Sequence, residues 1–453
     1  MAEPIRHDKT ARQLRLLSDA LDSGRLGPVR RMVNTLSPAE IGNLLESLPP
    51  GKRSVVWGLV DAEDDGEVLV HVGEEVRESL IADMDQDELV AAASDLDIDD
   101  LADLVEDLPD TVIDEVLKSM DRENRERLEQ VLSYAEDSAG RLMNPDIVTV
   151  RADTTIDVVL RYLRLRGELP DHTDHLYVVS KRHQYLGRIA LQALLTHEAG
   201  TPINQLLDDE QPAIDVNETS AEVARQFSDH DWISAPVVDD SNILLGRITI
   251  DDVVDIIREQ AEHQVMSAAG LDEDEDLFSP VRRAFRRRML WLTINLATAF
   301  LASSVVNQFQ DTIAHLVALA VLMPIVAGMG GNAGTQVLAL MVRGLALGQI
   351  GGTNIGVLVW KEVRIAIING IGIGLLLALI VLAWFHDAKL SLVIALALTV
   401  NFTSAALAGV FVPVTVKRFG FDPALAGGVI LTTVTDVMGF LSFLGLATLI
   451  LVR

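Results

Sequence analysis

The sequence predicts a multidomain protein: an all-α domain of helical repeats, a tandem α/β repeat, a long connecting helix and an α-helical membrane domain with five spans. Three observations support this prediction. The charge changes sharply along the chain, five long apolar stretches follow the change, and two blocks with matching strand and helix patterns precede it. The expected boundaries of the five parts are 1–137, 138–200, 201–256, 257–283 and 284–453.

Charge is divided unequally along the chain. The 453 residues include 37 Lys and Arg and 66 Asp and Glu, of which only 12 and 5 lie from Val281 onward. The acidic excess of the preceding part repels nucleic acid and anionic lipid and attracts cations. The absence of cysteine excludes disulfides and thiolate metal sites. The polar N-terminus lacks the apolar core of a signal peptide, so the acidic part is expected to stay in the cytosol.

Residues 1–137 have the pattern of short stacked helices. Ser37 is a predicted helix cap with Pro38 in the first turn, and similar units follow as in a helical solenoid. Three acidic residues recur at four-residue spacing on one helical face: Asp95, Asp99 and Asp103. Like charges at that spacing repel, and a bound cation relieves the repulsion. A solvated acidic face is the alternative interpretation.

Two similar blocks follow, each with the order strand, helix, strand, strand, helix. The strand-like segments are 143–150, 175–180 and 185–190 in the first block and 212–216, 235–240 and 245–254 in the second, the last of which runs into the final helix. This pattern resembles a tandem pair of CBS domains, a fold that often binds adenine nucleotides. In such domains a Thr and an Asp three residues later can hold ribose hydroxyls, and Thr249 and Asp252 match. Ala190 and Ala193 stand at those places in the first block, so a structural, dimer-forming pair is the alternative.

A long helix is predicted from Asp251 to about Ala268. Its acidic residues form one stripe at spacings of four, four and three: Asp251, Asp255, Glu259 and Glu262. The acidic segment 272–276 and a cluster of arginines come next. Because this helix joins the acidic part to the membrane part, it is placed to transmit movements of the acidic part to the membrane part.

Five apolar stretches are long enough to cross a bilayer. They are 289–309, 313–342, 354–385, 390–416 and 424–451. Glycine clusters in the second and third predict tilted or broken helices. Basic residues before the first stretch, between the second and third, and between the fourth and fifth all fall on one side. This charge pattern predicts a multi-pass protein of the cell (inner) membrane with a cytoplasmic N-terminus and an outer C-terminus.

One carboxylate, that of Asp436, lies within the fifth apolar stretch. At the centre of a membrane helix it costs about 2.5–3.5 kcal/mol, so it indicates an ion or proton site. The alternative is a buried carboxylate bonded to the hydroxyls of neighbouring threonines. Thr432, Asp436 and Gly439 share one helical face, which is narrow and polar, as a pore wall would be. For Asn332 in the second stretch, helix packing and pore lining are equally consistent.

The order of parts resembles the MgtE family of magnesium channels over nearly the whole chain. The most specific segments are Gly330-Gly-Asn-Ala-Gly-Thr-Gln336, Phe421-Asp-Pro-Ala-Leu425 and Thr432-Thr-Val-Thr-Asp-Val-Met-Gly439. The resemblance implies a homodimer in membrane lipid, with a Mg²⁺ pore on its twofold axis that cytosolic Mg²⁺ closes. It leaves modulation by ATP open.

The resemblance also implies roles for individual residues. Asp436 binds Mg²⁺ in the pore, and Asp422 helps to close its cytosolic mouth. The expected pore-lining residues are Asn332, Thr432 and Thr435. The expected regulatory metal ligands are Asp99, Asp103, Asp231, Asp252, Asp255 and Glu259, and the expected nucleotide-binding pair is Thr249 and Asp252. Other acidic positions of the family fall near Thr219, Ala221 and Gln260, so the number of regulatory ions stays open.

Ligand chemistry agrees with this interpretation. Mg²⁺ prefers oxygen ligands and keeps several waters, so two Asp436 carboxylates facing each other across an axis suit a hydrated ion. The alternatives are transport of Co²⁺ or Mn²⁺, export, or a membrane-anchored nucleotide sensor. The lack of Cys argues against selection of soft metals, and a mere anchor needs no intramembrane carboxylate. Without a nucleophile–base set or a P-loop, no enzymatic activity is expected.

Overall fold

The computed structural model describes residues 17, 19–23, 26–94, 96–271, 275–351 and 354–452. They fall into two compact units. The first contains the described residues up to 261 together with 275–279, and the second contains 262–271 and everything from Pro280. Several expectations concern residues outside the described ranges, namely Asp95, the start of the acidic segment at 272–274 and the N-terminal segment 1–16.

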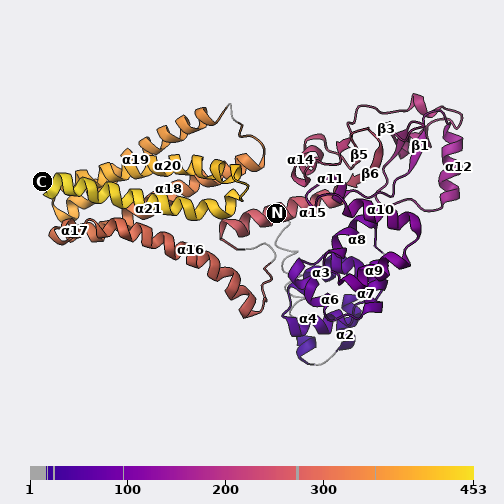
Figure 1. Cartoon of the computed structure of the whole chain (residues 1–453), viewed down its shortest axis with the longest axis horizontal. Coiled ribbons are helices and arrows are strands. Elements are labelled where there is room, and N and C mark those ends of the chain that lie inside the picture. The colour runs from indigo at the N-terminus through magenta and orange to yellow at the C-terminus, as the bar shows by residue number, and fades with distance from the viewer. Residues whose placement is uncertain are drawn as a thin grey trace. The chain divides into compact units, whose positions relative to one another are not determined.

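The first unit begins with short helices (Figure 1). They are α2 (Leu26–Val33), α3 (Pro38–Glu46), α4 (Pro50–Trp57), α5 (Asp65–Val70), α6 (Glu74–Ile81), α7 (Gln86–Ser94), α8 (Ile98–Val105), α9 (Asp110–Ser119) and α10 (Arg122–Leu132). Ser37 caps α3 as predicted: its hydroxyl accepts from the Glu40 N–H, and the Glu40 carboxylate accepts from the Ser37 N–H. The apolar faces of these helices share one core, which confirms the helical-repeat prediction.

The two predicted α/β blocks follow these helices in the first unit. The first has α11 (Ala139–Leu142), β1 (Thr149–Arg151), α12 (Ile156–Arg166), β2 (His175–Val179), β3 (Tyr185–Ala190) and α13 (Leu191–Thr196). The second has β4 (Ile214–Asp215), α14 (Ser220–His230), β5 (Ser234–Val238) and β6 (Leu244–Thr249). In each three-stranded sheet the first strand runs parallel to the second, and the second runs antiparallel to the third. Tyr177 and Tyr185 pack against Val238 and Leu244, so one apolar cluster joins the two sheets.

The long helix α15 (Ile250–Ala268) starts where β6 ends, as predicted. Beyond it, residues 275–279 lie against the N-terminal helices of the first unit. The Arg53 guanidinium is 2.7 Å from the Asp276 carboxylate, and both side chains are buried. The Glu75 carboxylate accepts from the Asp276 N–H at 3.3 Å and from the Ser279 hydroxyl at 2.5 Å. The N-terminal domain therefore holds the segment that directly precedes the first membrane helix.

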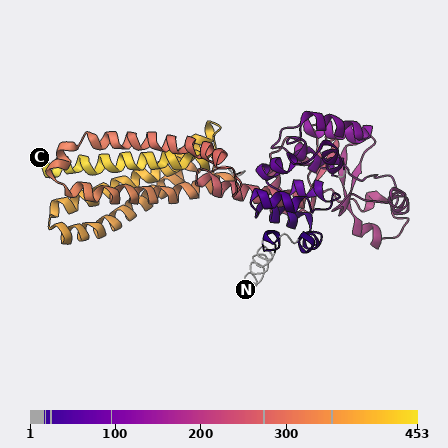
Figure 2. The same cartoon turned by 90° about the horizontal axis from the view of Figure 1, so that it is seen from below.

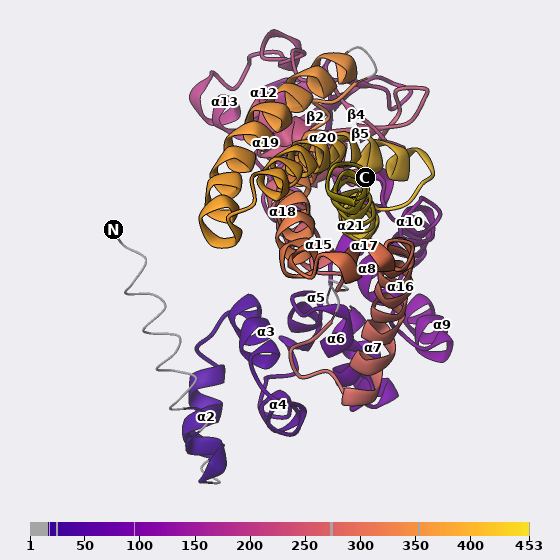
Figure 3. The same ribbon diagram turned by 90° about the vertical axis from the view of Figure 1, so that its left-hand side faces the viewer.

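The second unit is a bundle of long helices (Figure 2). They are α16 (Val281–Asn307), α18 (Ala318–Ala346), α19 (Ile355–Phe385), α20 (Ala388–Arg418) and α21 (Pro423–Ala447), and a short π-helix at Thr448–Val452 follows α21. Five helices in the described ranges are long and apolar enough to cross a membrane, which agrees with the five predicted spans. Seen along the bundle, α18, α20 and α21 lie together and α19 lies against α20 (Figure 3).

The membrane helices differ from the sequence predictions in three details. Glycine clusters predicted tilted or broken helices, and both α18 and α19 are continuous. The second span begins later than residue 313, because a short helix, α17 (Gln310–His315), precedes it. Two of the basic residues expected between the second and third spans, Lys361 and Arg364, lie within α19 instead. The glycines of α19 serve close packing instead: a Cβ on Gly370 would lie 2.7 Å from the Thr399 Cα of α20.

Candidate functional site

The start of α21 depends on the predicted gate residue. The Asp422 carboxylate accepts from the N–H groups of Ala424 and Leu425 at 2.8 and 3.1 Å, and Pro423 occupies the first turn. The same carboxylate lies 3.2 Å from Nε2 of His263, near the end of α15. Asp422 thus contacts the end of α15 while capping α21. No sequence pattern marked His263, because this contact joins segments 159 residues apart.

Asp436 occupies a half-buried position on α21. The neighbouring threonine hydroxyls point back to their own helix: Thr432 and Thr433 donate to carbonyls four residues earlier, at 2.9 and 2.7 Å. Thr435 donates to the Thr432 carbonyl at 3.0 Å. These three hydroxyls are therefore not used to satisfy the Asp436 carboxylate. The structure therefore does not support the alternative that these threonine hydroxyls bond to a purely structural Asp436 carboxylate.

The predicted pore-lining residues divide into two groups. Asn332 on α18 and Thr432 on α21 are exposed on the surface of the single-chain bundle. Thr435 is fully buried, and its hydroxyl oxygen lies 3.9 Å from where a Cβ on Gly331 of α18 would stand. The outer surface of these two adjacent helices thus carries an amide, a hydroxyl and the half-exposed Asp436 carboxylate.

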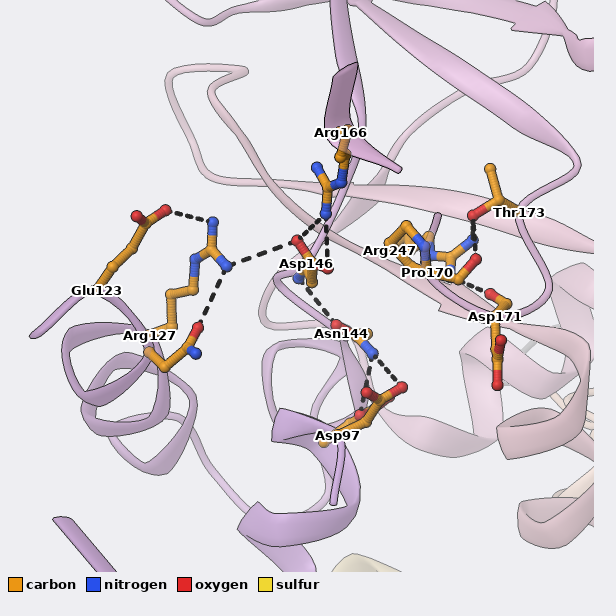
Figure 4. A network of polar contacts seen from close by, with 12 residues as sticks. Asp97, Glu123, Arg127, Asn144, Asp146, Arg166, Pro170, Asp171, Thr173 and Arg247 are labelled. Atoms are coloured by element: carbon orange, nitrogen blue, oxygen red, sulfur yellow. Dashed lines mark hydrogen bonds and ion pairs between the residues drawn. The ribbon is translucent and has the colours of Figure 1, made fainter. Parts of the chain in front are cut away.

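An acidic cluster lies where α8 meets the second α/β block. Asn144 is fixed to β6 by reciprocal backbone hydrogen bonds with Arg247, at 2.8 and 3.0 Å. Its side-chain amide donates to the carboxylates of Asp97 and Asp99, both at 3.2 Å. Figure 4 shows the Asn144 amide facing Asp97, with the remaining polar contacts spreading around them. Sequence reasoning missed Asn144 and Asp97, since neither belongs to a periodic acidic stripe.

The carboxylates of this cluster repel one another. Burial and the charge of Asp252 raise the pKa of Asp99 well above its ordinary range. Burial, and then the charges of Asp97 and Asp103, raise the pKa of Asp100 to about 7. Burial, with the charge of Asp251, raises the pKa of Asp252 to about 7. The structure therefore brings two predicted regulatory residues, Asp99 of α8 and Asp252 of α15, into electrostatic contact. A set of oxygen donors with excess negative charge suits a hard divalent cation.

Of the other predicted regulatory acids, Asp103 lies on α8 beside this cluster, and the rest lie elsewhere in the first unit. Asp103 is 3.9 Å from the Arg141 guanidinium, and Asp255 is 3.5 Å from that of Arg258. Asp231 is exposed at the left-handed C-cap of α14, and Glu259 is exposed on α15. Across the described ranges, no group of three or more acidic or histidine side chains is arranged to hold an ion directly. An ion bound through its own waters needs no such convergence.

The predicted nucleotide-binding pair is held together at the start of α15. Both the N–H and the hydroxyl of Thr249 contact the Asp252 carboxylate, at 3.3 and 3.2 Å, and the hydroxyl also contacts Asp251. Thr249 is buried, and its hydroxyl already has the Asp251 and Asp252 carboxylates as partners. Asp252 thus belongs to two arrangements, the pair with Thr249 and the acidic cluster with Asp99.

Known protein families match most parts of this architecture. The family described as a divalent cation transporter matches residues 323–446, the MgtE intracellular N domain matches 36–137, and the CBS domain matches 139–200 and 204–259. A solved cytosolic domain of the Mg²⁺ channel MgtE in complex with ATP is 28% identical, with a TM-score of 0.48 over 53% of this chain and 98% of that one.

Three relatives carry the name magnesium transporter MgtE. The Enterococcus faecalis protein is 30% identical over 71% of this chain and 71% of its own length. The Bacillus subtilis protein is 27% identical over 94% and 95%, and the Thermus thermophilus protein is 29% identical over 96% and 98%. The matching family models and the 30% identity to the Enterococcus faecalis protein over 71% of this chain agree, and the chain belongs to the MgtE family of magnesium transporters.

Proposed function

We propose that this chain is a Mg²⁺-selective channel that works as a homodimer and mediates magnesium uptake. Its N-terminus and first unit lie in the cytosol, and its C-terminus lies outside the cell (inner) membrane. Asp436 binds hydrated Mg²⁺ in the conduction path, Asn332, Thr432 and Thr435 line or support that path, and Asp422 closes its cytosolic mouth. Cytosolic Mg²⁺ bound by the acidic N and CBS domains favours the closed state.

One observation carries the proposal of a path between two copies. The surface of the single-chain bundle presents the polar side chains of Asn332, Thr432 and Asp436 on adjacent membrane helices. Lipid cannot solvate an amide or a carboxylate, so such groups face a bundle interior or a water-filled path. A second copy seated on this surface encloses them, and a twofold axis places each Asp436 opposite its own copy.

A crosslinking experiment tests this arrangement. The chain has no cysteine, so Thr432→Cys introduces a single thiol. In native membranes a short bifunctional thiol reagent is expected to join the two copies through this position, because a residue near a twofold axis lies near its own copy. Leu376→Cys, on the exposed surface of α19, is the matched control and is expected to stay monomeric on denaturing gels. Equal yields at both positions would contradict a dimer axis along α21.

Repulsion within the first unit supports the proposed regulation. Asp99, Asp100 and Asp252 come from the N domain and from α15, so an ion between them ties these parts together. Without Mg²⁺, the excess negative charge favours separation. A ligand shifts a conformational equilibrium only by the difference between its affinities for the two states. Several weakly bound Mg²⁺ ions that prefer the assembled form over the separated form are therefore sufficient to favour the assembled form.

We predict that Mg²⁺ compacts and stabilises residues 1–279, most strongly at high pH. The raised pKa values of Asp100 and Asp252 mean that the folded state holds more protons than the unfolded state between about pH 4 and 7. Stability without Mg²⁺ should therefore fall as pH rises through this window. Mg²⁺ replaces the bound protons, so its stabilising effect should be larger at pH 8 than at pH 6. Melting temperature, limited proteolysis and scattering radius across a Mg²⁺ series measure the effect.

The controls separate ion binding from screening. NaCl at matched ionic strength screens the same charges and should do little if the ions are bound. Asp99→Asn combined with Asp252→Asn should move the Mg²⁺ midpoint, whereas Glu126→Gln, on exposed α10, should not. Identical curves for the two salts, or an unmoved midpoint in the double variant, would remove this cluster from magnesium sensing.

Modulation by adenine nucleotide fits the same residues. Thr249 and Asp252 contact each other in the second CBS domain, and ribose hydroxyls offer both groups alternative partners. Because Asp252 also takes part in the acidic cluster, a bound nucleotide would alter the charge that regulatory Mg²⁺ experiences. ATP is therefore proposed as a modulator of closure and not as a source of energy.

A further inference from the structure

A buried amide occupies the centre of the membrane unit. Asn401 of α20 is fully buried, and its Nδ2 donates to the Val326 carbonyl of α18 at 2.9 Å. The opposite orientation of the amide would place its oxygen against that carbonyl, so the hydrogen bond fixes which atom is the nitrogen. The side chain thus connects α20 to α18 at one defined height.

Two glycines make room for this amide, one on each neighbouring helix. A Cβ on Gly330 of α18 would stand 2.1 Å from the Asn401 Nδ2, and a Cβ on Gly439 of α21 would stand 2.8 Å from it. Neither position tolerates a larger residue while the amide is present. Asn401 is therefore wedged between α18 and α21, in the space that the missing side chains of the two glycines leave.

Packing alone does not explain an asparagine here. Its Oδ1 is buried without a hydrogen-bond partner among the described residues. An unsatisfied buried acceptor is costly, and an apolar side chain of similar size would avoid that cost. What asparagine provides is a directional hydrogen bond to the Val326 carbonyl. Such a bond favours one axial position of α20 relative to α18, which apolar packing alone does not.

The wedge lies beside the residues assigned to ion conduction. Gly330 precedes Asn332 by two residues, and Gly439 follows Asp436 by three. We infer that Asn401 is a positioning residue for the conduction path: it fixes the height of Asn332 on α18 relative to Asp436 on α21. This inference rests on the proposed function, since it assigns Asn401 no contact with the ion.

Paired cysteines measure the register directly in this cysteine-free chain. The first pair is Gly331→Cys with Thr435→Cys, which joins α18 to α21 near the wedge. The control pair is Thr312→Cys with Thr448→Cys, which joins α17 to the C-cap of α21, where the two hydroxyl oxygens lie 2.8 Å apart. Each pair is examined with Asn401 intact and with Asn401→Leu, which keeps the size but loses the donor. Disulfide formation in membranes is the readout.

The expected result is that Asn401→Leu slows disulfide formation at the first pair by about threefold or more, the effect of one lost interhelical hydrogen bond, and leaves the control pair unchanged. In the cysteine-free background, the ratio of Mg²⁺ to Co²⁺ uptake should change as well. An unchanged rate at the first pair overturns the inference, and so does an unchanged ion ratio. A collapsed bundle slows both pairs and is thereby recognised. In that case the double variant Gly330→Ala with Asn401→Ala is examined. The proposal requires that this variant restores assembly of the bundle but not the native ratio of Mg²⁺ to Co²⁺ uptake. Recovery of both assembly and the native ratio overturns the proposal.

An intact chain that passes no ion at all would contradict the proposed function instead. In that case the two cysteine pairs still report whether Asn401 fixes the register of α18 and α21. Failure of the inference and failure of the proposed function are therefore distinguishable.

Discussion

Replacing Asp436 with alanine is expected to abolish Mg²⁺ conduction while leaving a folded, membrane-inserted dimer. Asp436 is half-buried on α21, and the neighbouring threonine hydroxyls are committed to backbone carbonyls. Its removal takes away the proposed charged ligand of the ion without breaking a side-chain hydrogen bond among the described residues. Uptake should fall by about two orders of magnitude or more, as expected for loss of about 2.8 kcal/mol of ion stabilisation.

Two conservative variants give this experiment its resolution. Asp436→Asn keeps the size and polarity but removes the charge, so it should be as inactive as Asp436→Ala. Asp436→Glu keeps the charge and moves it by one methylene, so it should retain part of the conduction with altered ion preference. An unchanged elution profile in detergent shows that assembly is intact. Full Mg²⁺ uptake by Asp436→Asn would remove this carboxylate from the mechanism.

Deleting residues 1–137 is expected to leave a conducting channel that closes poorly at high cytosolic Mg²⁺. The deletion removes Asp99 and Asp100 from the acidic cluster and releases the segment 275–279, which Arg53 and Glu75 hold in the intact chain. The Mg²⁺ concentration that half-closes the channel should rise by roughly tenfold, corresponding to about 1.4 kcal/mol of lost coupling. Patch recording at millimolar internal Mg²⁺ measures it.

A finer variant separates the two consequences of that deletion. Arg53→Ala combined with Glu75→Gln releases 275–279 but leaves Asp99 and Asp100 in place. Its closing midpoint should lie between those of the intact and the shortened chain if the segment before α16 transmits part of the signal. A shortened chain that closes at the same Mg²⁺ concentration as the full chain would show that the N domain has no part in gating.

Local patterns allowed much of the fold to be predicted. The cap at Ser37, the alternation of strands in the two CBS domains and the five apolar spans each depend on residues close in sequence. The same local patterns predicted a tilted or broken helix at the glycines of α19, and α19 is continuous there. Gly370 weakens a helix by its own propensity, but the close approach of Thr399 on α20 compensates, and that contact is invisible in a sequence window.

Candidate site residues could be predicted only where an unusual residue stands out in the sequence. A single carboxylate in an apolar stretch, Asp436, is such a residue. Thr435 lies in the same segment, but its sequence position does not reveal that it is buried against α18. Asn144, His263 and Asn401 are ordinary polar residues whose roles come from partners far along the chain. Such long-range pairings have no period, and tertiary packing alone creates them.

The most direct test of the central claim is ion uptake by proteoliposomes that contain only this protein. With little Mg²⁺ on the side of the first unit, Mg²⁺ from the opposite side should enter down its gradient, and Co²⁺ and Mn²⁺ should enter more slowly. Raising Mg²⁺ on the side of the first unit should then stop the uptake. Liposomes that stay empty of Mg²⁺ under the first condition, or that admit Co²⁺ or Mn²⁺ in preference to it, would contradict a Mg²⁺-selective channel.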